Sequence, residues 1–328
     1  MITTQSLLTK GFGVGVRQRS PEGRLALLPG AQAQPASAPR SSHESGPIGR
    51  HGTFEDFVRI ERHAMDALSL HNRFLSDVLP RIQQDPRVAG VAIAGSIARG
   101  HPDIYSDVDL IVVIDDEAFD RVMKERLELI GSWAALVAGF TGEHVGEPRL
   151  IITLVGPPLL HVDFKFVRAS DFAERVEDPD ILWDRDGDLA ASLAEHPPTD
   201  PSLDLQWIED RFWVWVHYGA TKLGRGELFE VIGFLSYLRE AVLSPLAARR
   251  MGASPRGVRH LEFIAPDEAR ALQATLCGYD RHDAGRALLA CVELYRQWLD
   301  DPAAVIEPRR HAEKLAVQYL HDVIDQVS

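Results

Sequence analysis

The sequence predicts an α+β protein: a small domain built on a mixed β-sheet, followed by an all-α helical bundle domain. Two patterns support this fold class. Between residues 87 and 187, short β-branched runs alternate with amphipathic helical segments, which is typical of one compact unit of strands and helices. From about Leu203 to the end, apolar residues recur at helical spacing. The stretch LAEHPPTDPSLDL, at 193–205, follows neither pattern and predicts a linker.

Length and charge narrow the class of protein. A chain of 328 residues is long enough for two domains with a core in each. No apolar run reaches the roughly 18 to 20 residues of a membrane span, so we expect a cytoplasmic protein that does not contact membranes. The net charge is −13, but residues 1–52 carry +4, which leaves −17 for the rest. Such a surface repels nucleic acid and favours a cationic partner, and the same charge also promotes solubility.

Residues 1–52 are expected to form a disordered tail, because they are rich in Ala, Pro, Ser and Gly and show no apolar periodicity. Residues 1–20 contain Arg and Ser but no acidic side chain, a composition that transit peptides share. They lack the apolar stretch of a secretory signal. The two domains that follow are expected at 53–190 and 203–328.

The first domain should open with a helix over 54–79, because its apolar residues recur at helical spacing, and Pro80 and the Asp85-Pro86 pair stop it. The elements expected after it are a strand over 87–95, a strand over 107–115, a helix over 117–140, strands over 149–156 and 159–167, and a short strand over 180–187. Gly156-Pro157-Pro158 separates two adjacent strands and predicts a hairpin turn.

The second domain should contain helices only. Trp207, Phe212 and Trp215 are expected to begin one helix, and further helices are expected over 226–252, 266–279, 283–301 and after Pro308. With Trp213, these three residues form an aromatic cluster. The aromatic cluster at the start has two interpretations, a hydrophobic core with a domain interface, or a platform on which a ligand stacks.

The stretch AGSIARGHPDIYSDVDLIVVID, from Ala94 to Asp115, contains most of the candidate site residues. Asp107 and Asp109 stand two residues apart at the start of an apolar strand, so both carboxylates point to the same face of the sheet. The strand LLHVDFKFV places His161, Asp163 and Lys165 on one face in the same way. If these two strands are neighbours, three carboxylates meet.

Three clustered carboxylates repel one another, and a bound cation relieves the repulsion. Mg²⁺ fits best, since it prefers oxygen ligands and is commonly shared between carboxylates and substrate phosphates. A pair of Mg²⁺ ions clamps the attacking and leaving oxygens in phosphoryl and nucleotidyl transfer. Gly95-Ser96 follows a strand and starts a short helix, where backbone N–H groups and a hydroxyl bind phosphate. Arg99 or Lys165 either adds positive charge there or forms an ion pair with a site aspartate.

The combined pattern resembles the signature of the nucleotidyltransferase superfamily that includes DNA polymerase beta. The similarity is carried by GSIARGHPDIYSDVDLIVV and Asp163, and it covers about residues 85–167. It implies that Asp107, Asp109 and Asp163 are catalytic and hold magnesium, that Gly95, Ser96 and Arg99 bind the nucleotide, and that ATP or another NTP is the co-substrate. It also implies that 53–190 is the catalytic domain.

Within this superfamily the chain most resembles the bacterial aminoglycoside adenylyltransferases, which also carry a helical domain after the catalytic one. The run DRFWVWVHYGATKLGRGELFEVIGFLSYLRE and the turn LWDRDG carry this second resemblance. It implies that Lys222 contacts the nucleotide phosphates and that 203–328 clamps nucleotide and substrate. A solvent-exposed Lys222 without that role is the other interpretation, and His161 is expected to support Asp163 or the fold.

The resemblance implies an enzyme that transfers a nucleoside monophosphate to a hydroxyl of a small molecule and releases pyrophosphate. A cationic aminoglycoside is the acceptor that fits both the family and the acidic charge, which connects the protein to antibiotic resistance. Asp163 is one candidate general base, and Glu209, Glu227 and Glu230 are others. Two alternatives stay open: nucleotidylation of a protein or tRNA, and a non-catalytic nucleotide-binding regulatory module.

Overall fold

A computed structural model describes residues 70–199, 203–299 and 306–327. The predicted tail at 1–52 and the first part of the helix predicted over 54–79 lie outside these residues. Residues 70–82 are helical. The helix therefore continues for two residues beyond Pro80, which lies in its last turn, and it ends before the second predicted stop at Asp85-Pro86.

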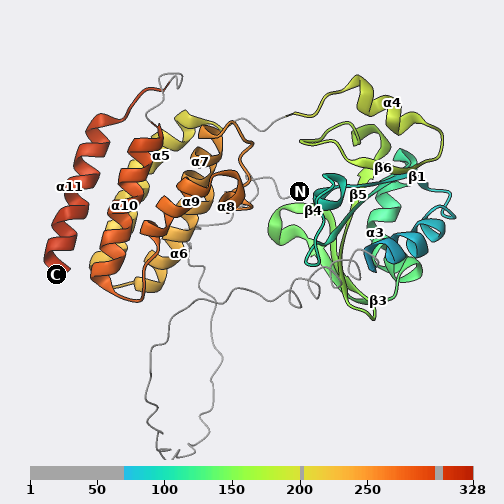
Figure 1. Ribbon diagram of the computed structural model, residues 1–328, viewed down its shortest axis with the longest axis horizontal. Helices are drawn as coiled ribbons and strands as arrows, with labels where there is room; N and C mark the ends of the chain where they lie inside the picture. Colours follow the sequence, from blue (N-terminus) through green and yellow to red (C-terminus); the bar gives the residue numbers. More distant parts are fainter. Residues whose placement is uncertain (1–69, 200–202, 300–305, 328) are drawn as a thin grey trace, which may run out of the picture.

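A six-stranded mixed sheet forms the first part of the molecule (Figure 1). Its strands, in spatial order, are β3 (Leu136–Gly142), β4 (Glu147–Val155), β5 (Leu160–Arg168), β2 (Val108–Ile114), β1 (Val88–Ile93) and β6 (Asp180–Asp184). β2 and β5 run parallel and the other neighbouring pairs antiparallel. The predicted α+β class with a mixed sheet is confirmed.

The sheet is buried on both faces at its centre. The helix over 70–82 and α3 (Asp116–Trp133) pack on one face, where Phe119, Ile130 and Trp133 join the alternate apolar residues of the strands. A smaller cluster on the sheet includes Leu189 of α4 (Asp188–Glu195) and Phe172. Alternation along β5 buries Leu160, Val162, Phe164 and Phe166 while His161, Asp163 and Lys165 stay on the other side, as the sequence predicts.

Two predicted elements of this part are wrong in their limits. The helix predicted over 117–140 ends at Trp133, and the apolar residues after it form the edge strand β3, which pairs with β4. The predicted linker over 193–205 starts too early, because α4 continues to Glu195. The predicted hairpin at 156–158 is present, since residues 156–159 form the turn between β4 and β5.

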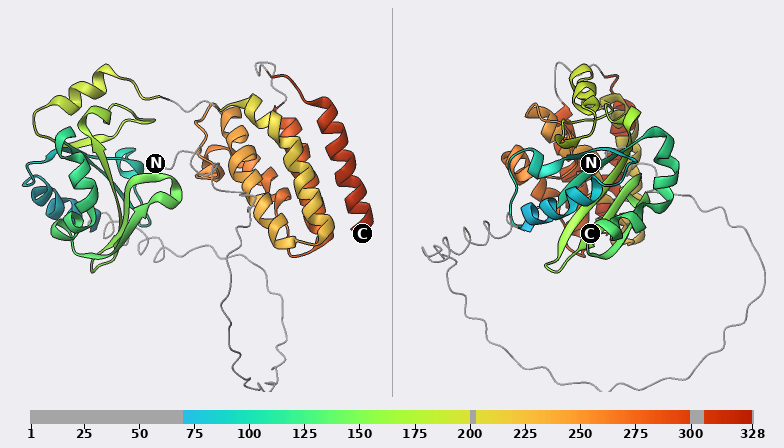
Figure 2. Two further views of the ribbon diagram at one scale, coloured as in Figure 1. Left: turned by 180° about the vertical axis from the view of Figure 1, so that it is seen from behind. Right: turned by 90° about the vertical axis from the view of Figure 1, so that its right-hand side faces the viewer.

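Among the described residues of the second part, helices joined by loops are the regular elements. Its helices are α5 (Leu205–Arg225), α6 (Leu228–Leu238), the π-helical turn η4 (Arg239–Leu243), α7 (Ser244–Arg250), α8 (Leu261–Ile264), α9 (Pro266–Leu272), α10 (Arg281–Leu299) and α11 (Arg310–Val327). α5 and α10 cross closely at Gly219, where a Cβ would lie 2.9 Å from Leu288 of α10. Figures 1 and 2 show this helical part beside the sheet part, with α11 on its outer side.

Two predicted helices differ in detail from those observed. The helix predicted over 226–252 is present but contains the π-helical turn η4, and the one predicted over 266–279 ends as a short 3₁₀ turn at Gln273–Thr275. By length and composition, Leu228–Arg250 passes as a membrane span, which the sequence analysis did not foresee. Its most apolar window is 61% buried within the protein, and its apolar side chains belong to the core of the helical part.

Candidate active site

The two aspartates of the opening motif lie beside β5. Asp107 immediately precedes β2, and Asp109 is the second residue of that strand. Because β2 and β5 are parallel neighbours, Asp109 stands directly opposite Asp163 in the register. The sequence could place Asp163 near the pair only on the condition that the strands were adjacent, and the structure meets that condition.

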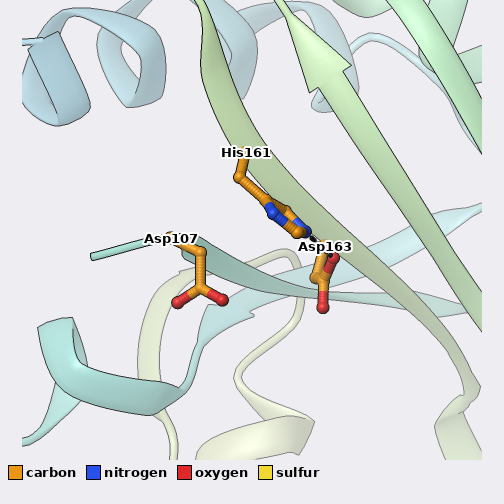
Figure 3. A group of neighbouring side chains, drawn as sticks. All are labelled: Asp107, His161 and Asp163. Atoms are coloured by element: carbon orange, nitrogen blue, oxygen red, sulfur yellow. Dashed lines mark hydrogen bonds and ion pairs between the residues drawn. The ribbon is translucent and has the colours of Figure 1, made fainter. Parts of the chain in front are cut away.

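Asp107, His161 and Asp163 form a compact group in which one ligand atom from each lies within 4.8 Å of the others. Figure 3 shows the imidazole of His161 beside Asp163, and His161 Nε2 lies 3.0 Å from Asp163 Oδ1. Asp109 is not part of this group. The structure therefore adds His161 to the predicted carboxylates, and the signal for it was its position two residues before Asp163 on the same strand face.

The carboxylates of this site are poorly compensated. Burial raises the pKa of Asp109 to about 6, with a further increase from the negative charges of Asp107 and Asp163 and an opposing effect from Arg259. Burial also raises the pKa of Asp163, although the contact with His161 lowers it. A cluster whose ionised form is unfavourable without a counter-charge is suited to a bound cation.

Gly95 and Ser96 lie at the start of the four-residue helix α2 (Gly95–Ala98), which follows β1. Gly95 has φ +70°, and a Cβ there would lie 1.9 Å from Asp109 Oδ2, so only glycine allows this contact. The hydroxyl oxygen of Ser96 is buried and has no hydrogen-bond partner among the described residues. A buried hydroxyl without a partner is unfavourable, and a ligand oxygen at this place would satisfy it.

The basic residues expected at the site already have carboxylate partners. Arg99 Nη1 donates to Glu177 at 3.0 Å, and Lys165 Nζ lies 3.1 Å from Glu147. Neither therefore pairs with the three aspartates as one interpretation of the sequence expected. Lys222 Nζ lies 2.6 Å from Glu227 and 5.3 Å from the ring centre of Tyr218, so its contacts are within the helical part and not at the carboxylates.

The candidate glutamates of the helical part also have partners. Glu209 is buried and accepts hydrogen bonds from Tyr295 Oη at 2.5 Å, Trp213 Nε1 at 3.0 Å and the backbone N–H of Arg309 at 2.7 Å. These contacts join α5 to α10 and to the segment before α11, which gives Glu209 a structural role. Trp213 and Phe212 are buried in the same core, so packing accounts for the two most buried members of the aromatic cluster.

The comparison with protein families agrees with this geometry. Residues 75–144 match the family model described as a nucleotidyltransferase domain. The chain carries a nucleotidyltransferase domain. The matched residues include β1, the Gly95-Ser96 loop and β2 with both aspartates, and they support the predicted enzyme class. The helical part lies outside the match, so the resemblance to aminoglycoside adenylyltransferases stays a prediction.

Comparisons with whole proteins add little. No curated protein matches the chain. Among solved structures, the chain is similar to the STING-associated CdnE c-di-GMP synthase from Capnocytophaga granulosa, with 12% sequence identity over 81% of this chain and 82% of that chain. The TM-score of 0.27 is too low for this likeness to support an argument about function.

The residues present fit a divalent cation next to a nucleotide. Asp107 and Asp163 offer carboxylate oxygens within reach of one ion, and oxygen is the ligand that Mg²⁺ prefers. Asp109 adds negative charge beside them. Gly95 lies against Asp109, and the next residue, Ser96, has a buried hydroxyl without a partner among the described residues. The arrangement can hold a charged, oxygen-rich ligand such as a metal-bound triphosphate.

Proposed function

We propose that the protein is a magnesium-dependent nucleotidyltransferase that transfers a nucleoside monophosphate from ATP or another NTP to a hydroxyl of a small molecule. The observation that carries the proposal is the convergence of Asp107, Asp109 and Asp163 on two parallel neighbouring strands, beside Gly95-Ser96. The nucleotidyltransferase match over 75–144 supports the same reaction type.

Each residue has a part in the proposed reaction. Asp107, Asp109 and Asp163 hold the metal, with His161 beside them, and Gly95, Ser96 and Arg99 lie at the phosphate end. Bound Mg²⁺ would neutralise charge on the phosphates. The acceptor oxygen forms a bond to the α-phosphorus, the bond to the β,γ-pyrophosphate breaks, and Asp163 receives the hydroxyl proton. Positioning and charge stabilisation supply most of the rate enhancement in such transfers.

The metal-holding role is tested with Asp107→Asn and Asp109→Asn. Each variant keeps the size of the side chain but removes a negative charge, so we expect loss of pyrophosphate release by at least about 100-fold with an unchanged circular dichroism spectrum. Asp186→Asn is the matched control, because Asp186 pairs with Arg185 on the surface. Retained turnover in both site variants would show that the metal assignment is wrong.

For the acceptor, we propose a cationic aminoglycoside. The net charge of −17 outside residues 1–52 supports a cationic acceptor and disfavours tRNA. The test incubates the protein with Mg²⁺, each of the four common NTPs in turn, and a panel that includes streptomycin and kanamycin. A mass gain of one nucleotidyl group on a panel member is the expected result. Transfer to a protein or to tRNA instead, or to no member of the panel, contradicts this acceptor.

A further inference from the structure

The loop between α7 and α8 carries two arginines, and it lies in close contact with Glu240. We call residues 254–260, SPRGVRH, the arginine segment. Glu240 in the π-helical turn η4 accepts a hydrogen bond from the backbone N–H of Val258 at 3.2 Å. A Cβ on Gly257, which has φ +60°, would lie 1.9 Å from Glu240 Oε1. The close fit of Glu240 against this loop holds Arg256 and Arg259 in place.

Arg256 extends from this segment to the sheet part. Its Nη2 lies 2.5 Å from Oε2 of Glu177. The same carboxylate accepts hydrogen bonds from Arg99 Nη1, at 3.0 Å on Oε1 and 3.2 Å on Oε2. Arg99 directly follows α2, the helix that Gly95 and Ser96 begin. Glu177 thus connects the candidate phosphate loop to the arginine segment, and two guanidinium groups share one carboxylate there.

Arg259 belongs to the same segment, three residues after Arg256. Its positive charge opposes the effect of Asp107 and Asp163 on the pKa of Asp109. The arginine segment therefore presents one cation that Glu177 joins to Arg99, and a second whose charge acts on Asp109. Lys222, the cation that the sequence resemblance assigned to the phosphates, is paired with Glu227 instead.

We propose that the arginine segment binds the triphosphate of the NTP, with Arg256 and Arg259 contacting phosphate oxygens and Glu177 acting as a positioning residue. This inference rests on the proposed function, because it takes an NTP as the ligand. A planar guanidinium donates two parallel hydrogen bonds to a phosphate, which makes arginine the side chain best suited to this role. Residual positive charge is available because Glu177 neutralises only one of its two arginines.

The test measures binding of Mg-ATP and of adenosine by isothermal titration to the full chain, without an acceptor. We expect Arg256→Ala and Arg259→Ala each to raise the Kd for ATP at least about 10-fold. The Kd for adenosine should change less than about 2-fold, since adenosine has no phosphates. Arg256→Lys and Arg259→Lys keep the charge and should recover part of the affinity. Arg270→Ala is the control, because Arg270 is an exposed residue of α9 paired with Asp267.

Three results would overturn the inference. The first is ATP affinity within about 2-fold of wild type in both alanine variants, with the charge-removing variants Arg256→Gln and Arg259→Gln used if an alanine variant does not fold. The second is an equal loss of ATP and adenosine affinity, which would indicate a structural role. The third is absence of ATP binding by the wild-type protein. Failure of the proposed transfer is separate, because it appears as turnover that survives in Asp107→Asn and Asp109→Asn.

Discussion

Gly95 lies so close to Asp109 that position 95 has no room for a side chain. Gly95 combines a left-handed φ of +70° with a Cβ position that lies 1.9 Å from Asp109 Oδ2. Any larger residue at this position both strains the backbone and displaces a carboxylate of the candidate site. The glycine of the motif is therefore explained by sterics as well as by access to phosphate.

Gly95→Ala should abolish transfer. The backbone strain alone costs about 1–2 kcal/mol, and the clash adds the displacement of Asp109, so we expect a lower melting temperature and at least about 100-fold less turnover. Gly100→Ala is a matched control, since Gly100 has φ +72° but nothing within 4 Å of its Cβ position. It should lose stability to a similar extent and keep activity. Equal activity in the two variants would contradict a role for the contact with Asp109.

Ser96→Ala should change stability and ligand binding in opposite directions. The Ser96 hydroxyl is buried without a partner, so its removal should raise the stability of the ligand-free protein by about 1 kcal/mol. The same change removes a hydrogen-bond donor to phosphate and should weaken ATP binding about 5- to 10-fold.

Ser244→Ala is the control, because it removes a second buried hydroxyl without a partner among the described residues, in α7 of the helical part. It should raise the stability of the protein and leave ATP binding unchanged. Urea unfolding and titration with ATP measure both effects, and a destabilised Ser96→Ala protein would contradict the assignment.

Among the elements, β4 and β5 are held together by an ion-pair group as well as by their ladder. Glu147, the first residue of β4, lies 2.8 Å from Arg149 Nε and 3.1 Å from Lys165 Nζ of β5. Burial alone would raise its pKa, but the hydrogen bond from Arg149 and the charge of Lys165 prevail and lower the pKa to about 2, from an ordinary value of 4.5. Folding therefore favours the ionised form of the Glu147 side chain.

This pairing should make part of the stability depend on pH. Because the folded pKa is lowered, the contribution of Glu147 is complete above pH 4.5 and is lost as the pH falls toward 2. We expect Glu147→Gln to lower the free energy of unfolding by up to about 3 kcal/mol at pH 7, and the difference from wild type to vanish near pH 2. Urea titrations across this range measure it. Asp120→Asn, which removes an exposed pair with Arg168, should cost less than about 1 kcal/mol, and a pH-independent effect of Glu147→Gln would refute the linkage.

Some elements can be predicted from the sequence, and others cannot. Strands β1, β2, β4 and β5 were predicted because their β-branched, alternating residues are local signals. β3 was not, because its apolar residues continue the pattern of α3, and only pairing with β4 makes a strand there. α4 was missed because its eight residues adjoin a Pro-rich stretch.

The same distinction applies to the candidate site. The aspartates and Gly95-Ser96 could be predicted, since their chemistry follows from spacing within a strand and at a strand end. The pairing of Glu177 with Arg99 and Arg256 could not, because these arginines are 78 and 79 residues away from it in the chain. No local pattern relates such positions. The group becomes visible only when the folded chain brings three separate segments together.

In the whole molecule, Glu177 contributes an ion pair that links the sheet part to the helical part. Its side chain is 18% exposed and binds Arg256 of the helical part at 2.5 Å. A charge-assisted hydrogen bond of this kind contributes about 1.5–3 kcal/mol, and about 1.4 kcal/mol corresponds to a tenfold change in an equilibrium. Loss of Glu177 should therefore lower the equilibrium constant for contact between the two parts by about tenfold or more.

Glu177→Ala should accordingly increase the radius of gyration measured by small-angle X-ray scattering. Salt at about 500 mM screens ion pairs, so it should increase the radius of the wild-type protein toward that of the variant and leave the variant unchanged. Asp120→Ala removes an ion pair within the sheet part and should behave as wild type. An identical radius for Glu177→Ala and wild type at about 50 mM salt would show that other contacts hold the two parts together. The arginine segment would then need no help from Glu177 to reach the site, and its two arginines would contribute to the affinity for ATP without it.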